Sequence, residues 1–293
     1  MPYSEWTRYL TEFSPVSAVA APPPDLYCAT EHAVPVKGWD EVGDEQLAEF
    51  WRRGFLIVAD AFQPSDVSAA ADAIAVLLGG TEPSYRPSPW GEKHGVLLRP
   101  GRSLESLAGP DRLDALVLAR GLVKHEPRLR AMAEHVGIRH FLERVMDDAP
   151  VLMHDMVRAK PPSPGDKPWH QDLTHFRLDP SSAVVTAWIA VDDAPLESGC
   201  LHFIPGSHLD GPAKHVFDRD YQIPDSAIPR TGQVAAPVTK GSCVLLHALV
   251  QHGSPPNRST GRRLALQLTF RPDTAVTISD EERILAFADR PGG

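Results

Sequence analysis

The sequence predicts a mainly β fold with flanking helices, in which a helical N-terminal half packs on a C-terminal β barrel. Two observations lead to this prediction. Before Pro150 the apolar side chains recur at helical spacing. After Pro150 short apolar runs alternate with Gly, Pro, Ser and Asp, which is the pattern of repeated short strands in a β sandwich or barrel. Because no flexible linker separates the halves, we expect residues 1–293 to form a single domain.

The N-terminal half divides into an arm and a helical support region. Residues 1–42 are punctuated by prolines, which predicts an extended arm on the surface. Residues 43–150 form the support region, where Gly54 is a plausible helix stop. Helices are expected over DEQLAEFWRR, over QPSDVSAAADAIAVLLGG, near 111–122 and over 127–147, with FLIVADAF as a strand after the first of them.

The C-terminal half, residues 151–272, is the predicted barrel core, and residues 273–293 are expected to be a C-terminal tail. Its strands are expected in the runs VLMHDMVRAK, SAVVTAWIAV, GCLHFIPG, GSCVLLHALV and RRLALQLTF. The proline-rich segment PPSPGDKP lies between two of these strands. We therefore interpret it as a loop over a site rather than as a linker.

Composition limits the classes of function. The 29 basic and 38 acidic residues give a net charge of -9, which argues against a nucleic-acid-binding protein and favours a small-molecule substrate. No run approaches the roughly 18 apolar residues of a membrane span. Cys28, Cys200 and Cys243 lie far apart and suggest neither a disulfide framework nor a thiolate zinc site. These features, with an N-terminus unlike a secretory signal, predict a cytoplasmic protein; the oligomeric state stays open.

The segment KPWHQDLTHF contains the first candidate site. His170 and Asp172 are two residues apart, so in an extended strand both side chains leave the same face and reach one metal ion. A second His-x-Asp pair, His208 and Asp210, lies in the turn-forming PGSHLDG, where the glycines make a fixed strand geometry unlikely. We therefore predict that the first pair binds metal.

His252 and Arg263 flank a turn-rich segment and complete the candidate constellation. Alternation in RRLALQLTF places Arg263 on the polar face and Arg262 on the leucine face. A hairpin centred between 257 and 258 would put His252 opposite Arg263, whereas His247 is expected in the core. Two histidines and one carboxylate on one side of a metal are the arrangement of non-heme iron(II) oxygenases, and a guanidinium suits a bidentate grip on a carboxylate.

The segments HQDLTHF, VVTAWIAVDDAPLESGCLHFIPGSH and HGSPPNRSTGRR together resemble the phytanoyl-CoA dioxygenase family of iron(II)- and 2-oxoglutarate-dependent oxygenases. The resemblance implies a double-stranded β-helix, also called a jelly roll or cupin-like fold. It places the iron ligands at His170, Asp172 and His252, and the residue that binds 2-oxoglutarate at Arg263. Further contacts with the co-substrate are implied for Met156, Trp188 and Ser254, and for a basic residue of the helical half, Arg120 or Lys124.

The same resemblance implies a dioxygenase that uses O2 to hydroxylate an unactivated C–H bond and releases succinate and CO2. Its substrate would be a small organic molecule: an acyl-CoA, a free acid, an amino acid or a natural-product intermediate. Related halogenases carry a small residue in place of the carboxylate, so Asp172 favours hydroxylation or desaturation.

The alternative function is a metal-binding cupin-like barrel that does not use 2-oxoglutarate, either an isomerase or a noncatalytic sensor. Arg263 argues against this alternative. The elements expected to face the substrate are residues 80–110, residues 208–232, Thr174, His175 and Arg177.

Overall fold

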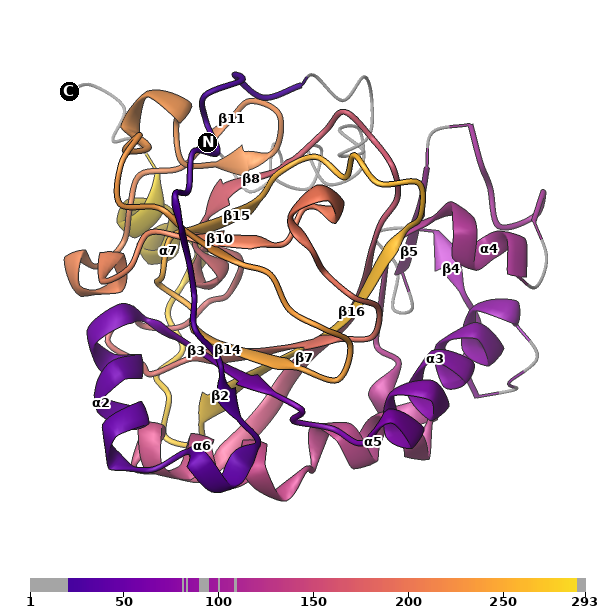
Figure 1. Ribbon diagram of the computed structural model, residues 1–293, viewed down its shortest axis with the longest axis horizontal. Coiled ribbons are helices and arrows are strands. Elements are labelled where there is room, and N and C mark those ends of the chain that lie inside the picture. Colours follow the sequence, from indigo (N-terminus) through magenta and orange to yellow (C-terminus); the bar gives the residue numbers. More distant parts are fainter. Residues whose placement is uncertain are drawn as a thin grey trace.

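The computed structural model describes residues 21–80, 82, 84–89, 95–99, 101–107 and 110–288. Residues 1–20 of the expected arm and part of the expected 80–110 loop lie outside this range. The described residues form two β-sheets that pack face to face, with helices against one of them (Figure 1). The predicted jelly roll with a helical N-terminal half is confirmed.

The larger sheet has nine strands. Their spatial order is β2 (Val36–Lys37), β3 (Phe55–Ala59), β14 (Cys243–His247), β9 (Val185–Ala190), β16 (Arg263–Pro272), β7 (Pro150–Lys160), β6 (Leu116–Arg120), β5 (Gly95–Leu98) and β4 (Ser88–Pro89). One face of β16 carries Leu264, Leu266 and Leu268 into the main core, and the other face carries Ala265 into the space between the sheets. The alternation predicted for RRLALQLTF is therefore confirmed.

The smaller sheet has five strands and covers the inner face of the larger one. Its order is β1 (Glu31–His32), β13 (Val234–Ala236), β10 (Leu201–Phe203), β15 (His252–Ser254) and β8 (Lys167–His170). Phe203 of this sheet stacks on Phe55 of the larger sheet, with ring centroids 4.2 Å apart. A separate hairpin, β11 (Val216–Phe217) and β12 (Tyr221–Gln222), lies in the segment expected to face the substrate.

Helices cover the outer face of the larger sheet. They are α2 (Asp44–Arg53), α3 (Pro64–Gly79), α4 (Pro110–Ala115), α5 (Pro127–Ala133) and α6 (Val136–Met146). Figure 1 shows α2, α6, α5 and α3 along the lower side of the molecule, where their apolar residues join the core formed with β16. None of the described helices is both long and apolar enough to cross a membrane.

Local signals explain where the predicted helices begin and end. The backbone N–H of Gly43 donates to the Gln46 side chain at the start of α2, and Gly54 ends this helix in the left-handed conformation. Pro64 occupies the first turn of α3, where its missing N–H costs nothing, and Gly80 ends it. These two helices and the strand β3 between them confirm the predicted elements.

Two predictions of local structure need correction, and the structure adds elements to the arm and the tail. The segment near 111–122 is helical only in α4 and continues as β6, because LVLAR pairs along β7. The stretch 127–147 forms two helices, since α5 ends before its C-cap Glu134 and His135 caps α6 by accepting from the Gly137 N–H. Part of the arm joins the sheets as β1 and β2. The C-terminal tail contains α7 (Asp280–Phe287), begun by a capping box of Ser279 and Glu282.

Candidate metal centre

Three potential metal ligands converge between the two sheets. The Nε2 atoms of His170 and His252 lie 3.4 and 3.6 Å from Oδ1 of Asp172. All three ligand atoms are within 4.8 Å of one another, and all three side chains are buried. In the described part of the chain no other group of three such side chains lies this close together, so His208 and Asp210 do not form a rival site.

Strand pairing brings the two imidazoles together. His170 ends β8, and the antiparallel register with β15 places His252 directly opposite, with ring centroids 4.3 Å apart. Gln171 is extended, and Asp172 begins a short 3-10 helix, Asp172–His175. The extended link turns Asp172 to the same side as His170, although Asp172 lies outside the strand.

The predicted hairpin between His252 and Arg263 is wrong. β15 and β16 belong to different sheets, and the residue opposite Arg263 is Lys160 of β7. The turn-rich segment after Ser254 carries the chain from one sheet to the other, as a jelly roll requires. His252 and Arg263 therefore reach the same interior from facing sheets.

Each imidazole is held by a backbone carbonyl. Nδ1 of His170 donates to the Pro168 carbonyl over 2.8 Å, and Nδ1 of His252 donates to the Val250 carbonyl over 3.0 Å. Since a carbonyl oxygen can only accept, both hydrogens are on Nδ1, and the Nε2 lone pairs are available to a metal. Burial lowers the pKa of both histidines below the ordinary value, so the rings are neutral, as metal binding requires.

Asp172 is held as a carboxylate. Burial raises its pKa, but attraction to the positive charge that His252 and His170 would carry at acidic pH, together with the Thr186 hydrogen bond, outweighs burial and holds the pKa well below the usual range. Oγ1 of Thr186 donates to Oδ2 over 2.9 Å and lies 3.2 Å from Oγ1 of Thr269. One carboxylate oxygen is therefore engaged by β9, and Oδ1 faces the histidines. Two neutral nitrogens and one anionic oxygen are a donor set that fits iron(II).

Thr186→Val should weaken metal binding while preserving the fold. Without the hydroxyl, Oδ2 of Asp172 loses its donor and the carboxylate is free to rotate, and the loss of such a supporting bond typically costs about 10- to 100-fold in metal affinity. Titration with Mn(II) measures the change. Thr186→Ser keeps the hydroxyl and should bind metal as the unmodified chain does, whereas equal affinity of Thr186→Val would show that the bond does not orient the ligand.

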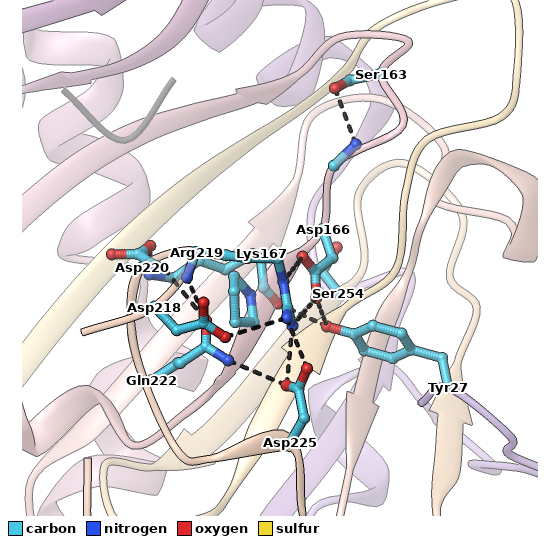
Figure 2. Close-up of polar contacts among 12 residues, drawn as sticks. Tyr27, Ser163, Asp166, Lys167, Asp218, Arg219, Asp220, Gln222, Asp225 and Ser254 are labelled. Atoms are coloured by element: carbon cyan, nitrogen blue, oxygen red, sulfur yellow. Dashed lines mark hydrogen bonds and ion pairs between the residues drawn. The ribbon is translucent and has the colours of Figure 1, made fainter. Parts of the chain in front are cut away.

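A network of polar side chains fixes the segment that leads into β8, as Figure 2 shows. Asp166 accepts from the Tyr27 hydroxyl over 2.8 Å and from Nε of Arg219 over 3.1 Å. Arg219 also binds Asp225 over 2.6 Å, and the Tyr27 ring stacks on Trp169, centroids 5.5 Å apart. The N-terminal arm and the 208–232 segment thus hold the strand that carries His170. Nothing local in the sequence marks Tyr27 or Arg219 for this role.

Arg263 is a buried cation with an incomplete set of partners. It is 1% exposed, one terminal nitrogen donates to the Gly199 carbonyl over 2.8 Å, and its guanidinium lies 5.1 Å from the Trp188 ring centroid. Its Nε has no hydrogen-bond partner, and no carboxylate of the described residues forms an ion pair with it. Burial lowers the pKa of Arg263 to about 10, so the group is charged at neutral pH. A desolvated cation of this kind fits the far carboxylate of a bound diacid.

The other residues expected near the co-substrate line the same interior. Met156 of β7 and Trp188 of β9 both stand opposite Gln267 of β16, on the face that carries Arg263. The Ser254 hydroxyl donates to the Gly199 carbonyl over 2.7 Å, so Ser254 and Arg263 share one acceptor. Gly199 is required there, because a Cβ would lie 2.3 Å from the Pro255 carbonyl oxygen.

The remaining residues predicted to contact the co-substrate or the substrate lie in different environments. Arg120 stands opposite Met156 and so belongs to the site face, whereas Lys124 is exposed on a 3-10 helix, Val123–His125. Thr174 is buried, and Arg177 is exposed and pairs with Asp280 over 3.8 Å. His175 is exposed beside His170, with ring centroids 6.2 Å apart.

His247 is buried beside His208, with ring centroids 5.1 Å apart, and its Nδ1 accepts from the Leu249 N–H. It is therefore a core residue, as expected.

Comparison with known proteins identifies relatives for most of the chain. The family described as phytanoyl-CoA dioxygenase (PhyH) matches residues 50–265. Phytanoyl-CoA dioxygenase domain-containing protein 1 of Danio rerio is 31% identical over 187 residues, 59% of this chain and 63% of that protein. The peroxisomal phytanoyl-CoA dioxygenase of Rattus norvegicus is 36% identical over 141 residues, 44% of this chain and 41% of that protein. The match thus spans less than two thirds of either relative.

Solved structures share the fold. A non-heme alpha ketoglutarate dependent carbocyclase from nogalamycin biosynthesis, SnoK, has a TM-score of 0.63 and 21% identity, covering 89% of this chain and 98% of that one. EvdO2 from Micromonospora carbonacea var. aurantiaca, complexed with 2-oxoglutarate, has a TM-score of 0.60 and 20% identity, covering 88% of this chain and 100% of that one. At these identities the likeness establishes the jelly roll alone.

Proposed function

Because this chain belongs to the phytanoyl-CoA dioxygenase family, we propose that it is an iron(II)- and 2-oxoglutarate-dependent dioxygenase that hydroxylates a small organic substrate. One observation carries the proposal: a buried group of two histidines and an aspartate shares its interior with a buried arginine that has no carboxylate partner among the described residues. A metal-binding barrel without 2-oxoglutarate has no use for that uncompensated cation, which is costly to bury. The complex of EvdO2 with 2-oxoglutarate supports the reading, since it shares this fold.

Each residue of the site would have a role that follows from its position. His170, His252 and Asp172 would hold iron(II) through Nε2, Nε2 and Oδ1, leaving the other side of the metal to 2-oxoglutarate and O2. The bound iron and co-substrate supply the oxidising chemistry, with succinate and CO2 as co-products. Arg263 would pair with the far carboxylate of 2-oxoglutarate. The co-substrate pocket would be lined by Trp188, Met156 and Ser254, which would orient the co-substrate and exclude water.

Hydroxylation is the outcome that the ligand set favours. Asp172 occupies the position that a halogenating relative leaves open for halide, so this chain retains a full set of three protein ligands. The solved structures that share the fold include a carbocyclase and an epimerase, so the fold alone does not select the reaction. The type of reaction depends on which hydrogen atom of the substrate the site holds next to the metal.

Succinate formation tests the proposal. The protein is loaded with iron(II) without oxygen, 2-oxoglutarate is added, and the visible absorption of a keto acid chelated to iron(II) reports binding. On admission of O2 with ascorbate, we expect 2-oxoglutarate to be consumed with equal amounts of succinate, only when iron(II) is present. Iron binding without either the absorption or succinate would instead favour a metal-binding barrel that does not use 2-oxoglutarate.

A further inference from the structure

The inner face of the larger sheet carries more permanent positive charge than one co-substrate neutralises. On β7, Arg158 stands opposite Ala265 and Lys160 stands opposite Arg263. Residues directly opposite in an antiparallel pair point to the same side, so Arg158 and Arg263 share the face that also bears Trp188. The hydrogen bond from Nε of Arg158 to the Gln267 side chain, 3.2 Å, confirms this orientation.

Arg158 faces both the metal centre and the co-substrate region. Ala265, which stands opposite Arg158, packs in the space between the two sheets, so Arg158 lies on the face that looks toward the smaller sheet, where His170 and His252 pair. Its side chain is half-buried, and of its nitrogens Nε alone is engaged by another described side chain. No hydrogen bond or ion pair with another described residue engages the two terminal nitrogens.

The nearby carboxylates already have partners. Asp172 belongs to the metal centre and accepts from Thr186. Asp220 pairs with Lys167 over 2.5 Å. Among the described residues no carboxylate forms an ion pair with Arg158, although a partly desolvated guanidinium ordinarily has one.

A charge balance over the proposed active site identifies the cation that has no anionic partner. In the proposed oxygenase, Asp172 and the near carboxylate of 2-oxoglutarate balance iron(II), and the far carboxylate balances Arg263. Burial and the charge of Arg263 lower the pKa of Lys160 well below its ordinary value, and its Nζ donates to the Ser254 carbonyl over 2.8 Å. Lys160 therefore does not require an anion of its own. Arg120 also lies on this face, opposite Met156, and the family resemblance makes it a candidate contact of the co-substrate. Arg158 remains as a permanent cation with which no carboxylate of the described residues forms an ion pair.

We propose that Arg158 binds an anionic oxygen group of the primary substrate, a carboxylate or a phosphate, and so fixes the substrate beside the metal. A guanidinium with two free terminal nitrogens can grip such a group bidentately, which sets orientation as well as affinity. The proposal rests on the proposed function, because it assigns 2-oxoglutarate to Arg263. It makes the substrate an anion and makes Arg158 a specificity-determining residue.

The test uses the full chain with Mn(II) in place of iron and with N-oxalylglycine, an unreactive analogue of 2-oxoglutarate, bound. Carbon-13 acetate and inorganic phosphate are titrated separately, and relaxation of their nuclei by Mn(II) reports binding near the metal. We expect saturable relaxation of at least one anion, and none of neutral acetamide. In Arg158→Gln the anion affinity should fall about tenfold or more, the usual scale for losing a hydrogen-bonded charge. The anion that responds distinguishes a carboxylate from a phosphate substrate.

Control variants keep the result interpretable. Arg139→Gln removes a solvent-exposed guanidinium on α6 that pairs with Glu143, and should leave anion binding unchanged. Arg158→Lys retains the positive charge and should retain part of the anion affinity. It also provides a second test of the proposal if Arg158→Gln does not fold.

Three outcomes overturn the proposal: no anion binds, anion binding is unaffected in Arg158→Gln, or this variant loses affinity for N-oxalylglycine instead. Failure of N-oxalylglycine to bind the unmodified chain would refute the proposed function itself.

Discussion

Asp172→Asn is expected to lose iron(II) and to abolish 2-oxoglutarate turnover while the chain still folds. The amide has almost the same shape as the carboxylate, but it removes the negative charge that balances the metal among two neutral imidazoles. Removing a supporting residue alone costs about 10- to 100-fold in metal affinity, so removing a ligand should exceed about 100-fold. The amide side chain carries no charge that burial must desolvate, so the fold should not suffer.

The measurement is iron retained after desalting, together with succinate formed per minute. Asp210→Asn is the matched control, because Asp210 belongs to the other His-x-Asp pair and is exposed outside the metal centre. It should retain iron and turnover. If Asp172→Asn kept iron with the affinity of the unmodified chain, Asp172 would not be a ligand.

Arg263→Gln is expected to weaken 2-oxoglutarate binding far more than iron binding. The buried guanidinium would form hydrogen bonds to the far carboxylate, and truncating one partner of a buried charge pair costs about 2 kcal/mol or more, roughly 30-fold in affinity. Iron affinity should stay close to that of the unmodified chain, since no hydrogen bond or ion pair joins Arg263 to any of the three ligand side chains. Titration of 2-oxoglutarate into the iron(II) protein without oxygen, and of Mn(II) into the metal-free protein, measures both.

The neighbouring residue provides the control for this variant. Arg262 carries the same charge, directly precedes β16 and pairs with Asp114 of α4, whose side chain is exposed. Arg262→Gln should leave 2-oxoglutarate affinity unchanged. Equal losses in the two variants, or equal losses of iron and 2-oxoglutarate in Arg263→Gln, would contradict the assignment of Arg263 to the co-substrate.

The two sheets contribute different parts of the candidate site. The smaller sheet brings His170 and His252 side by side through the pairing of β8 with β15. The larger sheet supplies Arg263, Trp188 and the Thr186 hydroxyl that holds Asp172. Facing sheets in a jelly roll can therefore place a metal ion and an anion-binding cation in one interior, even though no single hairpin contains both.

The sequence by itself determined which residue types are available and which side of an element they occupy. The two-residue spacing indicated that His170 and Asp172 share one side, and alternation distinguished Arg263 from Arg262. The order of motifs indicated the family. These features depend on local periodicity, which the backbone geometry of a strand or helix converts directly into direction.

Only the tertiary structure decided which strands pair and which charges stay uncompensated. His252 lies opposite His170 rather than Arg263, and LVLAR became a strand because β7 was beside it. The support of Asp172 by Thr186, and the lack of a carboxylate partner for Arg158 in the described part of the chain, also depend on residues distant in the sequence. Register, desolvation and charge pairing result from packing between segments far apart along the chain, and local periodicity carries no information about them.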